Sequence, residues 1–148
     1  MQNYMEEAIK EAEKAFAEDE VPIGCVIVHD GKIIAREHNT KIADNNSLFH
    51  AEMKALFKAQ QILGSKYLYD CEMYVTTEPC AMCAGALINT RMGKLCFALE
   101  EPKSGCCGSV FNLLDGKFNH KVEIEKNVLR EKALKLMQDF FKNKRSDK

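Results

Sequence analysis

The chain has 148 residues, of which 46% are hydrophobic and 29% are charged, values that are ordinary for one globular domain. We therefore expect a single domain over residues 1–148, with a core large enough to fold without disulfides. The 21 basic and 22 acidic residues leave a formal charge of -1, which excludes a global field that attracts nucleic acid. Any contact with RNA must then be local.

The sequence gives no sign of a membrane segment or a secretory signal. No run of residues is apolar enough to cross a bilayer, and the N-terminal residues lack the pattern of basic and then apolar residues. The seven cysteines are odd in number and irregularly spaced, which argues against a disulfide framework. We expect a cytoplasmic protein without membrane contacts, whose cysteines are mostly reduced and buried.

The N-terminal part predicts a helix followed by a β-hairpin. Hydrophobic residues recur at helical spacing between residues 5 and 16, with charged residues on the other side. Two β-rich runs follow, residues 24–28 and 33–35, and Asp30-Gly31 between them favours a tight turn.

A second helix, a strand and a third helix are expected in the middle of the chain. The second helix follows a polar stretch at residues 39–47, and Gly64 should end it. Residues 71–76 are rich in β-formers, and residues 80–88 form an alanine-rich helical segment behind Pro79.

The remaining elements complete an α/β fold. Residues 95–99 predict a strand, residues 100–116 a loop and residues 122–124 a short strand, and apolar residues between 129 and 140 recur at helical spacing. Helices that alternate with strands predict a three-layer α-β-α domain, with helices on both faces of a central mixed sheet of about five strands.

Two short motifs at predicted helix starts carry most of the chemical information. Cys80 and Cys83 lie one helical turn apart, so both sulfurs can reach one tetrahedral zinc ion. His50 provides a third ligand, and three ligands leave a position for water. Glu52 lies two residues from His50 and is suited to act as a general base beside that water.

Each motif, taken alone, also occurs in proteins without a catalytic zinc. An isolated Cys-x-x-Cys pair is found in redox sites, in cores and in zinc ribbons, a lone histidine is more often buried with a partner, and Glu52 alone suits a helix start. A zinc ribbon needs a second Cys-x-x-Cys pair, and Cys106-Cys107 has the wrong spacing. A redox pair leaves His50 and Glu52 unexplained, so the combination favours a catalytic zinc site.

The H-x-E and P-C-x-x-C motifs resemble those of the zinc-dependent nucleoside and nucleobase deaminases. Residues 20–28, 68–92 and 103–105 extend the likeness to the tRNA-specific adenosine deaminases of bacteria, over nearly the whole chain. This resemblance implies a cytidine-deaminase-like fold and hydrolytic deamination of adenosine to inosine at the wobble position of tRNA by a zinc-activated water. It also implies one Zn²⁺ per subunit and a homodimer.

Carried over by position, the resemblance assigns His50, Cys80 and Cys83 to zinc and Glu52 to proton transfer. It also implies that Asn39 helps to hold the target nucleoside, although a turn asparagine often bonds its own backbone instead. The sequence departs from the family pattern at three residue pairs, which are Leu48-Phe49, Glu100-Glu101 and Cys106-Cys107.

The C-terminal segment is the predicted RNA contact. Residues 126–148 hold 8 Lys and Arg against 3 Asp and Glu, whereas residues 1–20 hold 2 against 7. The side chains expected to contact phosphates are Lys142, Lys144 and Arg145, and Phe140 or Phe141 is expected to stack at the base site. Basic residues also suit a helix C-terminus, and paired phenylalanines often lie in a core. The expected partner is a tRNA anticodon stem-loop with its target base turned out, and no DNA.

Two other functions remain open at this point. A deaminase of a free nucleobase or nucleotide, of guanine or cytosine type, uses the same zinc, water and glutamate. A zinc-containing or RNA-binding subunit without activity is the second alternative, and Glu52 argues against it because such a subunit needs no proton carrier.

Overall fold

The computed structural model describes residues 3–146, and for residues 145 and 146 only the backbone. Its centre is a sheet in the order β2-β1-β3-β4-β5. The strands are β1 (Gly24–His29), β2 (Lys32–His38), β3 (Cys71–Thr77), β4 (Lys94–Leu99) and β5 (Glu123–Lys126). Because β1 is antiparallel to both β2 and β3, while β3, β4 and β5 are parallel, the sheet is mixed, as predicted.

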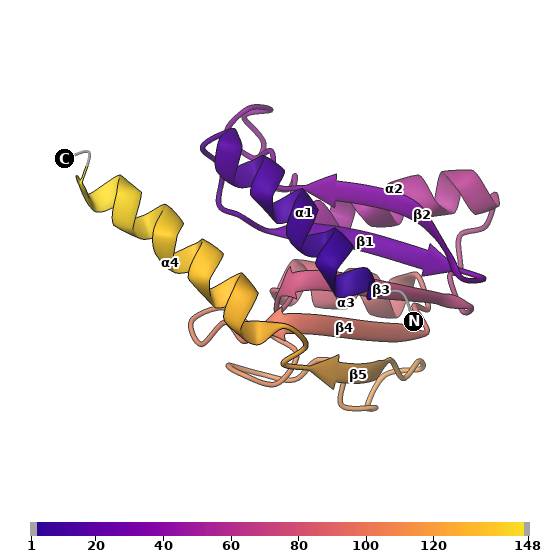
Figure 1. The fold of residues 1–148 in the computed structure, drawn as a ribbon. Coiled ribbons are helices and arrows are strands. Elements are labelled where there is room, and N and C mark those ends of the chain that lie inside the picture. The colour runs from indigo at the N-terminus through magenta and orange to yellow at the C-terminus, as the bar shows by residue number, and fades with distance from the viewer. Residues whose placement is uncertain (1–2, 147–148) are drawn as a thin grey trace.

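Four helices cover the two faces of the sheet, which confirms the three-layer prediction (Figure 1). The helices are α1 (Tyr4–Ala17), α2 (Ala51–Leu63), α3 (Ala81–Asn89) and α4 (Arg130–Ser146). Helices α1 and α4 lie on one face and α2 and α3 on the other (Figure 1). Each face has its own core, and Val26 in the first and Ile27 in the second illustrate how neighbouring strand residues point to opposite sides.

The ends of the elements follow local chemistry. The Asn3 side chain accepts a hydrogen bond from Met5 N at 3.0 Å and so caps α1. Gly64 ends α2 in the left-handed conformation, with φ 59°, as predicted. Strand β2 runs to His38, three residues beyond the predicted end. The polar side chains that obscured the pattern bond to the helices on both faces: Arg36 pairs with Glu7 of α1 at 2.7 Å, and Glu37 pairs with Lys54 of α2 at 3.8 Å.

The topology brings two helix starts to one end of the sheet. Strand β2 precedes α2 and strand β3 precedes α3, and both strands run antiparallel to β1, which lies between them. Their carboxyl ends therefore point the same way, and the first residues of α2 and α3 lie near each other on the same face (Figure 1). The two sequence motifs sit at these starts.

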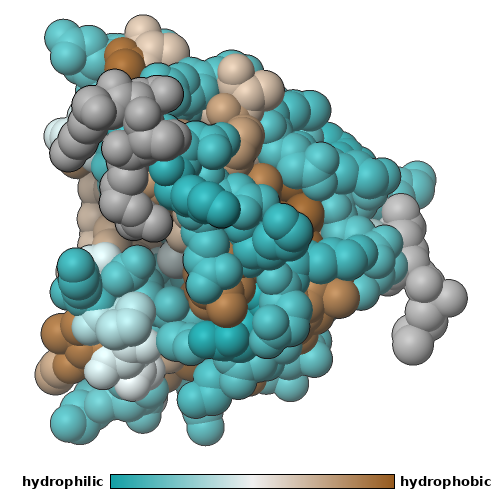
Figure 2. All heavy atoms as spheres, turned by 60° about the vertical axis from the view of Figure 1, so that its left-hand side comes forward, coloured by the Kyte–Doolittle hydropathy of each residue, from teal (hydrophilic) through white to brown (hydrophobic). Residues whose placement is uncertain are grey.

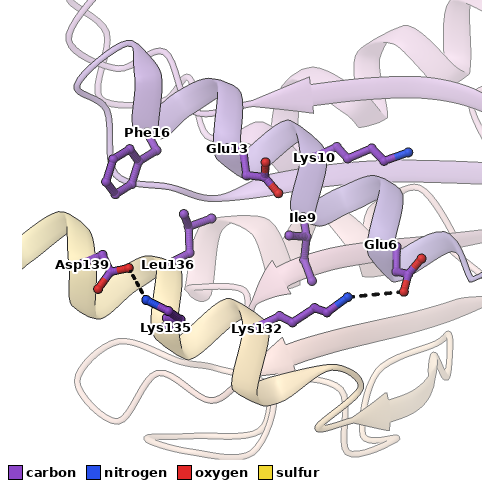
Figure 3. A pocket seen from close by; sticks show the side chains of 9 residues that line it. All are labelled: Glu6, Ile9, Lys10, Glu13, Phe16, Lys132, Lys135, Leu136 and Asp139. Carbon is purple, nitrogen blue, oxygen red and sulfur yellow. Dashed lines mark hydrogen bonds and ion pairs between the residues drawn. The ribbon is translucent and has the colours of Figure 1, made fainter.

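Helix α4 touches α1 along one side and leaves a groove of about 620 Å³ between them. Ile9, Phe16 and Leu136 point into this groove (Figure 3). Ion pairs border it, including Lys132 with Glu6 at 3.5 Å (Figure 3). The basic helix thus faces the acidic one. Within residues 3–146, none of the helices has the length and apolar character needed to cross a membrane.

Candidate active site

The two motifs provide the first residues of α2 and α3. His50 is the N-cap residue of α2 and Cys80 is that of α3, and neither caps its helix with its own side chain. Both side chains are therefore available to bind elsewhere. The unpaired N–H groups at these helix starts favour negative charge close by, which suits thiolates and carboxylates.

His50, Cys80 and Cys83 converge. The Nδ1 atom of His50 lies 3.7 Å from Cys80 Sγ and 3.6 Å from Cys83 Sγ, and all three ligand atoms lie within 4.8 Å of one another. A tetrahedral zinc ion bound at ordinary lengths separates a nitrogen and a sulfur ligand by roughly 3.5 Å. The geometry of the three side chains thus fits a metal ion with one imidazole and two sulfur ligands.

The electrostatics of the cysteine pair support thiolate formation. Hydrogen bonds from Cys83 and His50 lower the pKa of Cys80 to about 3. The hydrogen bond to Cys80 and burial raise the pKa of Cys83, and the contact with Cys80 also raises the pKa of His50. One thiolate is thus present at neutral pH, and a metal has to displace the remaining protons.

Glu52 lies in the first turn of α2 and is only 4% exposed. Burial raises the pKa of its carboxyl group. Glu52 lines a cavity of about 160 Å³ together with His50 and Cys80. A buried carboxyl group beside a potential metal site has the position that a proton carrier needs.

Asn39 both caps a helix and lines the cavity. Its Oδ1 accepts a hydrogen bond from Ala51 N at 3.0 Å, so the side chain caps α2 and does not bond its own turn. Asn39 is 4% exposed and lines the same cavity as Glu52. It therefore connects the loop after β2 to the helix that carries His50 and Glu52.

The sequence reasoning missed Glu78, which precedes Pro79 and is 4% exposed. Its carboxylate accepts hydrogen bonds from the backbone N–H groups of Glu101, Cys107 and Ser109, each at 3.0 Å, and from the Ser109 hydroxyl. Burial alone raises the pKa of Glu78, but the hydrogen bonds from Ser109 and the backbone outweigh it and lower the pKa overall. Only its place in the Glu78-Pro79-Cys80 run hinted at this role.

These bonds fix the segment 101–109, which we call the wall loop because Glu101 and Ser104 line the cavity. Gly105 has to be a glycine here, because a Cβ atom would lie 2.5 Å from both carboxylate oxygens of Glu78. Cys107 is 3% exposed and packs inside the loop.

The other departures from the family pattern lie outside the cavity. Glu100 forms an ion pair with Arg130 at 2.7 Å, and this contact lowers the pKa of Glu100 to about 2. Leu48 and Phe49 line a separate apolar groove on the outer side of α2.

The structure does not bring the predicted tail residues into the cavity. Phe140 is buried and stacks edge-on against Phe16, whereas Phe141 is 45% exposed. Lys144 pairs with Asp19 at 2.6 Å, Lys142 is exposed, and the side chain of Arg145 lies outside the described residues.

Helix α4 nevertheless projects past the end of the sheet where α2 and α3 begin (Figure 1). Figure 2 shows this end of the molecule as mostly hydrophilic, with hydrophobic residues in separate patches. RNA contacts by the tail stay a prediction.

Comparison with known proteins connects the site to a family. Residues 1–145 match the sequence model of the MafB19-like deaminases. The tRNA-specific adenosine deaminase of Bacillus subtilis (strain 168) is 45% identical, and the alignment covers 98% of this chain and 91% of that protein. The protein of that name from Aquifex aeolicus (strain VF5) is 42% identical over 97% of this chain and 95% of its own length.

Solved structures agree. A structure from studies of A-to-I editing by tRNA:A34 deaminases superposes with a TM-score of 0.85 at 34% identity, and covers 90% of this chain and 97% of its own. The guanine deaminase of Nitrosomonas europaea superposes with a TM-score of 0.80 at 23% identity, and covers 92% of this chain and 81% of its own, which shows a shared fold.

Proposed function

This chain belongs to the MafB19-like deaminases and to the tRNA-specific adenosine deaminases, and we propose that it hydrolyses adenosine to inosine at the wobble position of a tRNA anticodon. The observation that carries this proposal is one cavity lined by His50, Glu52 and Cys80, with Cys83 beside it. A tRNA substrate agrees with the cytoplasmic location expected from the sequence.

We propose that His50, Cys80 and Cys83 hold one Zn²⁺ per subunit. Two sulfurs and one imidazole nitrogen form a ligand set that zinc prefers, and their separations suit its bond lengths. When bound, zinc supplies a Lewis acid that polarises a water molecule. Two negatively charged ligands weaken that effect, so a nearby base is required.

Glu52 is the proposed proton carrier. Its carboxylate takes a proton from the attacking water and delivers it to the ring nitrogen N1 as the C6–O bond forms. It then takes the proton of the new C6 hydroxyl group and delivers it to the amine, which leaves as ammonia as the C6–N bond breaks and the C6=O group of inosine forms. Burial suits this role because it raises the pKa of the carboxyl group toward neutrality, where a group both accepts and donates protons. Asn39 lines the cavity and is the proposed contact to the target nucleoside.

The cavity limits what can react. At about 160 Å³ it accommodates a single base, so the target nucleotide has to leave its stack. Unstacking is least costly in a loop, which favours the anticodon loop over a duplex. Phe141, Lys142 and Arg145 remain proposed contacts to the rest of the stem-loop.

We also propose a homodimer. A groove of about 550 Å³ beside the motif of His50 is lined by Leu48, Phe49, Met53, Phe57 and Met82. Phe57 is 63% exposed and Leu48 59%, and hydrophobic surface of this kind marks protein interfaces. We expect two subunits by light scattering at micromolar concentration and dissociation by Phe57→Ser, and a monomeric wild type would contradict the proposal.

One experiment tests the proposed reaction against its alternatives. Purified protein is incubated with an anticodon stem-loop that carries a wobble adenosine, and separately with free adenine, guanine and cytosine, and the products are quantified by mass spectrometry. We expect inosine in the stem-loop alone. Turnover of a free base without turnover of the stem-loop would identify a nucleobase deaminase, and zinc-containing protein inactive on all substrates would indicate a subunit without activity.

A further inference from the structure

The cavity carries an excess of negative charge. Glu52, Glu78 and Glu101 line it, and Lys41 is the only lysine or arginine among the described residues that line it. The proposed Zn²⁺ balances the charges of its two sulfur ligands, so the three carboxyl groups determine the sign of the remaining charge. RNA carries one negative charge at each phosphate, so carboxylates at the cavity wall oppose its approach. A cation at the rim is needed to offset this repulsion.

The backbone around Lys41 is held in place. Glu20 is 2% exposed, and its carboxylate accepts hydrogen bonds from Ile42 N at 3.1 Å and Ala43 N at 2.8 Å. The Lys41 carbonyl accepts a hydrogen bond from Asn46 N at 3.0 Å. The side chain therefore starts from a fixed point, which reduces the entropic cost of binding a ligand.

The ammonium group of Lys41 has no hydrogen bond or ion pair with the side chains that the structure describes, those of residues 3–144. The side chain is nevertheless half-buried. The other half-buried lysines differ: Lys54 donates to Thr40 at 2.8 Å, Lys94 pairs with Glu125 at 3.0 Å, and Lys144 pairs with Asp19 at 2.6 Å. A partly desolvated cation without an anion is costly, and an anionic ligand restores its interactions.

We propose that Lys41 binds a backbone phosphate adjoining the target nucleotide. The proposal rests on the proposed function, because it takes RNA as the ligand. It assigns the phosphate contact nearest the reacting base to the loop after β2, and not to the basic tail. A lysine suits this task because its ammonium group is a compact charge that tolerates several approach directions.

The test is a double-substitution cycle that removes the positive charge of Lys41, the negative charge of a phosphate, or both. The proteins are wild type, Lys41→Gln and the control Lys32→Gln, whose exposed lysine begins β2 at the opposite end of the sheet. Each also carries Glu52→Ala, so that substrate is not consumed. The probes are an anticodon stem-loop with natural phosphates and two versions with one neutral methylphosphonate, 5′ or 3′ of the wobble adenosine. Fluorescence anisotropy gives Kd at several salt concentrations.

We expect Lys41→Gln to raise Kd about 5–10-fold and to lower the slope of log Kd against log salt by about 0.7–0.9, while Lys32→Gln changes Kd less than about twofold. One of the two methylphosphonate substitutions should raise Kd by a similar factor for the protein that retains Lys41. The same substitution should leave Kd unchanged for the Lys41→Gln protein.

Equal weakening by both methylphosphonates in both proteins, or an unchanged salt slope, would overturn the assignment. Turnover by protein with an intact Glu52 is measured separately. If the Lys41→Gln and methylphosphonate effects on Kd are not additive but no inosine forms, only the proposed reaction is contradicted. If inosine forms but the two effects on Kd are additive, only the role of Lys41 is contradicted.

Discussion

Replacing Glu78 by glutamine should loosen the wall loop without removing any side-chain volume. The carboxylate accepts four hydrogen bonds, two at each oxygen. Glutamine keeps one acceptor, which can serve Cys107 and Ser109, but its NH₂ group then faces the N–H of Glu101. One partly buried donor, the N–H of Glu101, is left unpaired, and the remaining bonds are weaker because their acceptor is no longer charged.

The magnitude follows from these bonds. A hydrogen bond to a charged group contributes about 1.5–3 kcal/mol, and a neutral one about 1 kcal/mol. We therefore expect Glu78→Gln to lower the free energy of unfolding by about 2–3 kcal/mol at neutral pH, which corresponds to a fall in Tm of about 5–10 °C for a domain of this size. Urea unfolding measures the free energy and calorimetry measures Tm.

The difference should depend on pH. Because the pKa of Glu78 is lowered in the folded protein, its stabilising effect is complete above the unfolded value of about 4.3 and is lost as pH falls through the folded-state pKa. Glutamine does not titrate, so the gap between wild type and Glu78→Gln should narrow below about pH 4. Any metal contributes to both proteins and cancels in the comparison.

A matched variant shows whether the effect is local. Glu20 is as buried as Glu78 but accepts from Ile42 and Ala43, so Glu20→Gln should speed hydrogen exchange at those two amides. Glu78→Gln should instead speed exchange at the amides of Glu101, Cys107 and Ser109. A Glu78→Gln protein within about 0.5 kcal/mol of wild type, or one with unchanged exchange in the wall loop, would refute this reasoning.

Three further predictions concern the site and the tail. Glu52→Ala should retain zinc, measured by elemental analysis, while turnover of the stem-loop falls about 10²–10⁴-fold, and full activity would remove Glu52 from the mechanism. Cys83→Ser should lose zinc and activity together, since one of three ligands is removed; a variant with full zinc content would show that Cys83 is not a ligand. Neutralising Lys142, Lys144 and Arg145 together should lower the salt slope of tRNA binding by about 0.7–0.9 for each phosphate that is no longer bound, without changing zinc content. The decrease should correspond to fewer than three phosphates because Lys144 already pairs with Asp19, and an unaltered slope would exclude the tail from binding.

The convergence of His50, Cys80 and Cys83 could be predicted because its signal is local. Cys80 and Cys83 are one helical turn apart, and His50 and Glu52 share one helix start, so short-range spacing already limits where the side chains point. The tertiary fold had only to bring the N-termini of α2 and α3 close together. The sheet could be predicted for the same reason, since each strand is a short β-rich run between turn residues.

The contacts around the cavity could not be predicted, because they join residues that are distant in the sequence. Glu78 accepts hydrogen bonds from residues 23 to 31 positions away, and Lys144 meets Asp19 across 125 positions. A glutamate before Pro79 reads as ordinary polar sequence until the wall loop is seen to fold over it. The basic tail likewise looks free until α4 is placed beside the acidic α1.

The site therefore has two parts, the proposed metal ligands and the cavity walls, and different elements hold each part in place. The proposed metal ligands stand on helix starts, whose positions are fixed by the sheet and both cores. The cavity walls are loops, each held by one buried carboxylate, Glu20 on one side and Glu78 on the other. A wall can therefore change with little effect on the metal ligands. Because a fold does not by itself determine the substrate, the residues that select the substrate should be sought in these two loops, where Lys41 and Glu101 face the cavity.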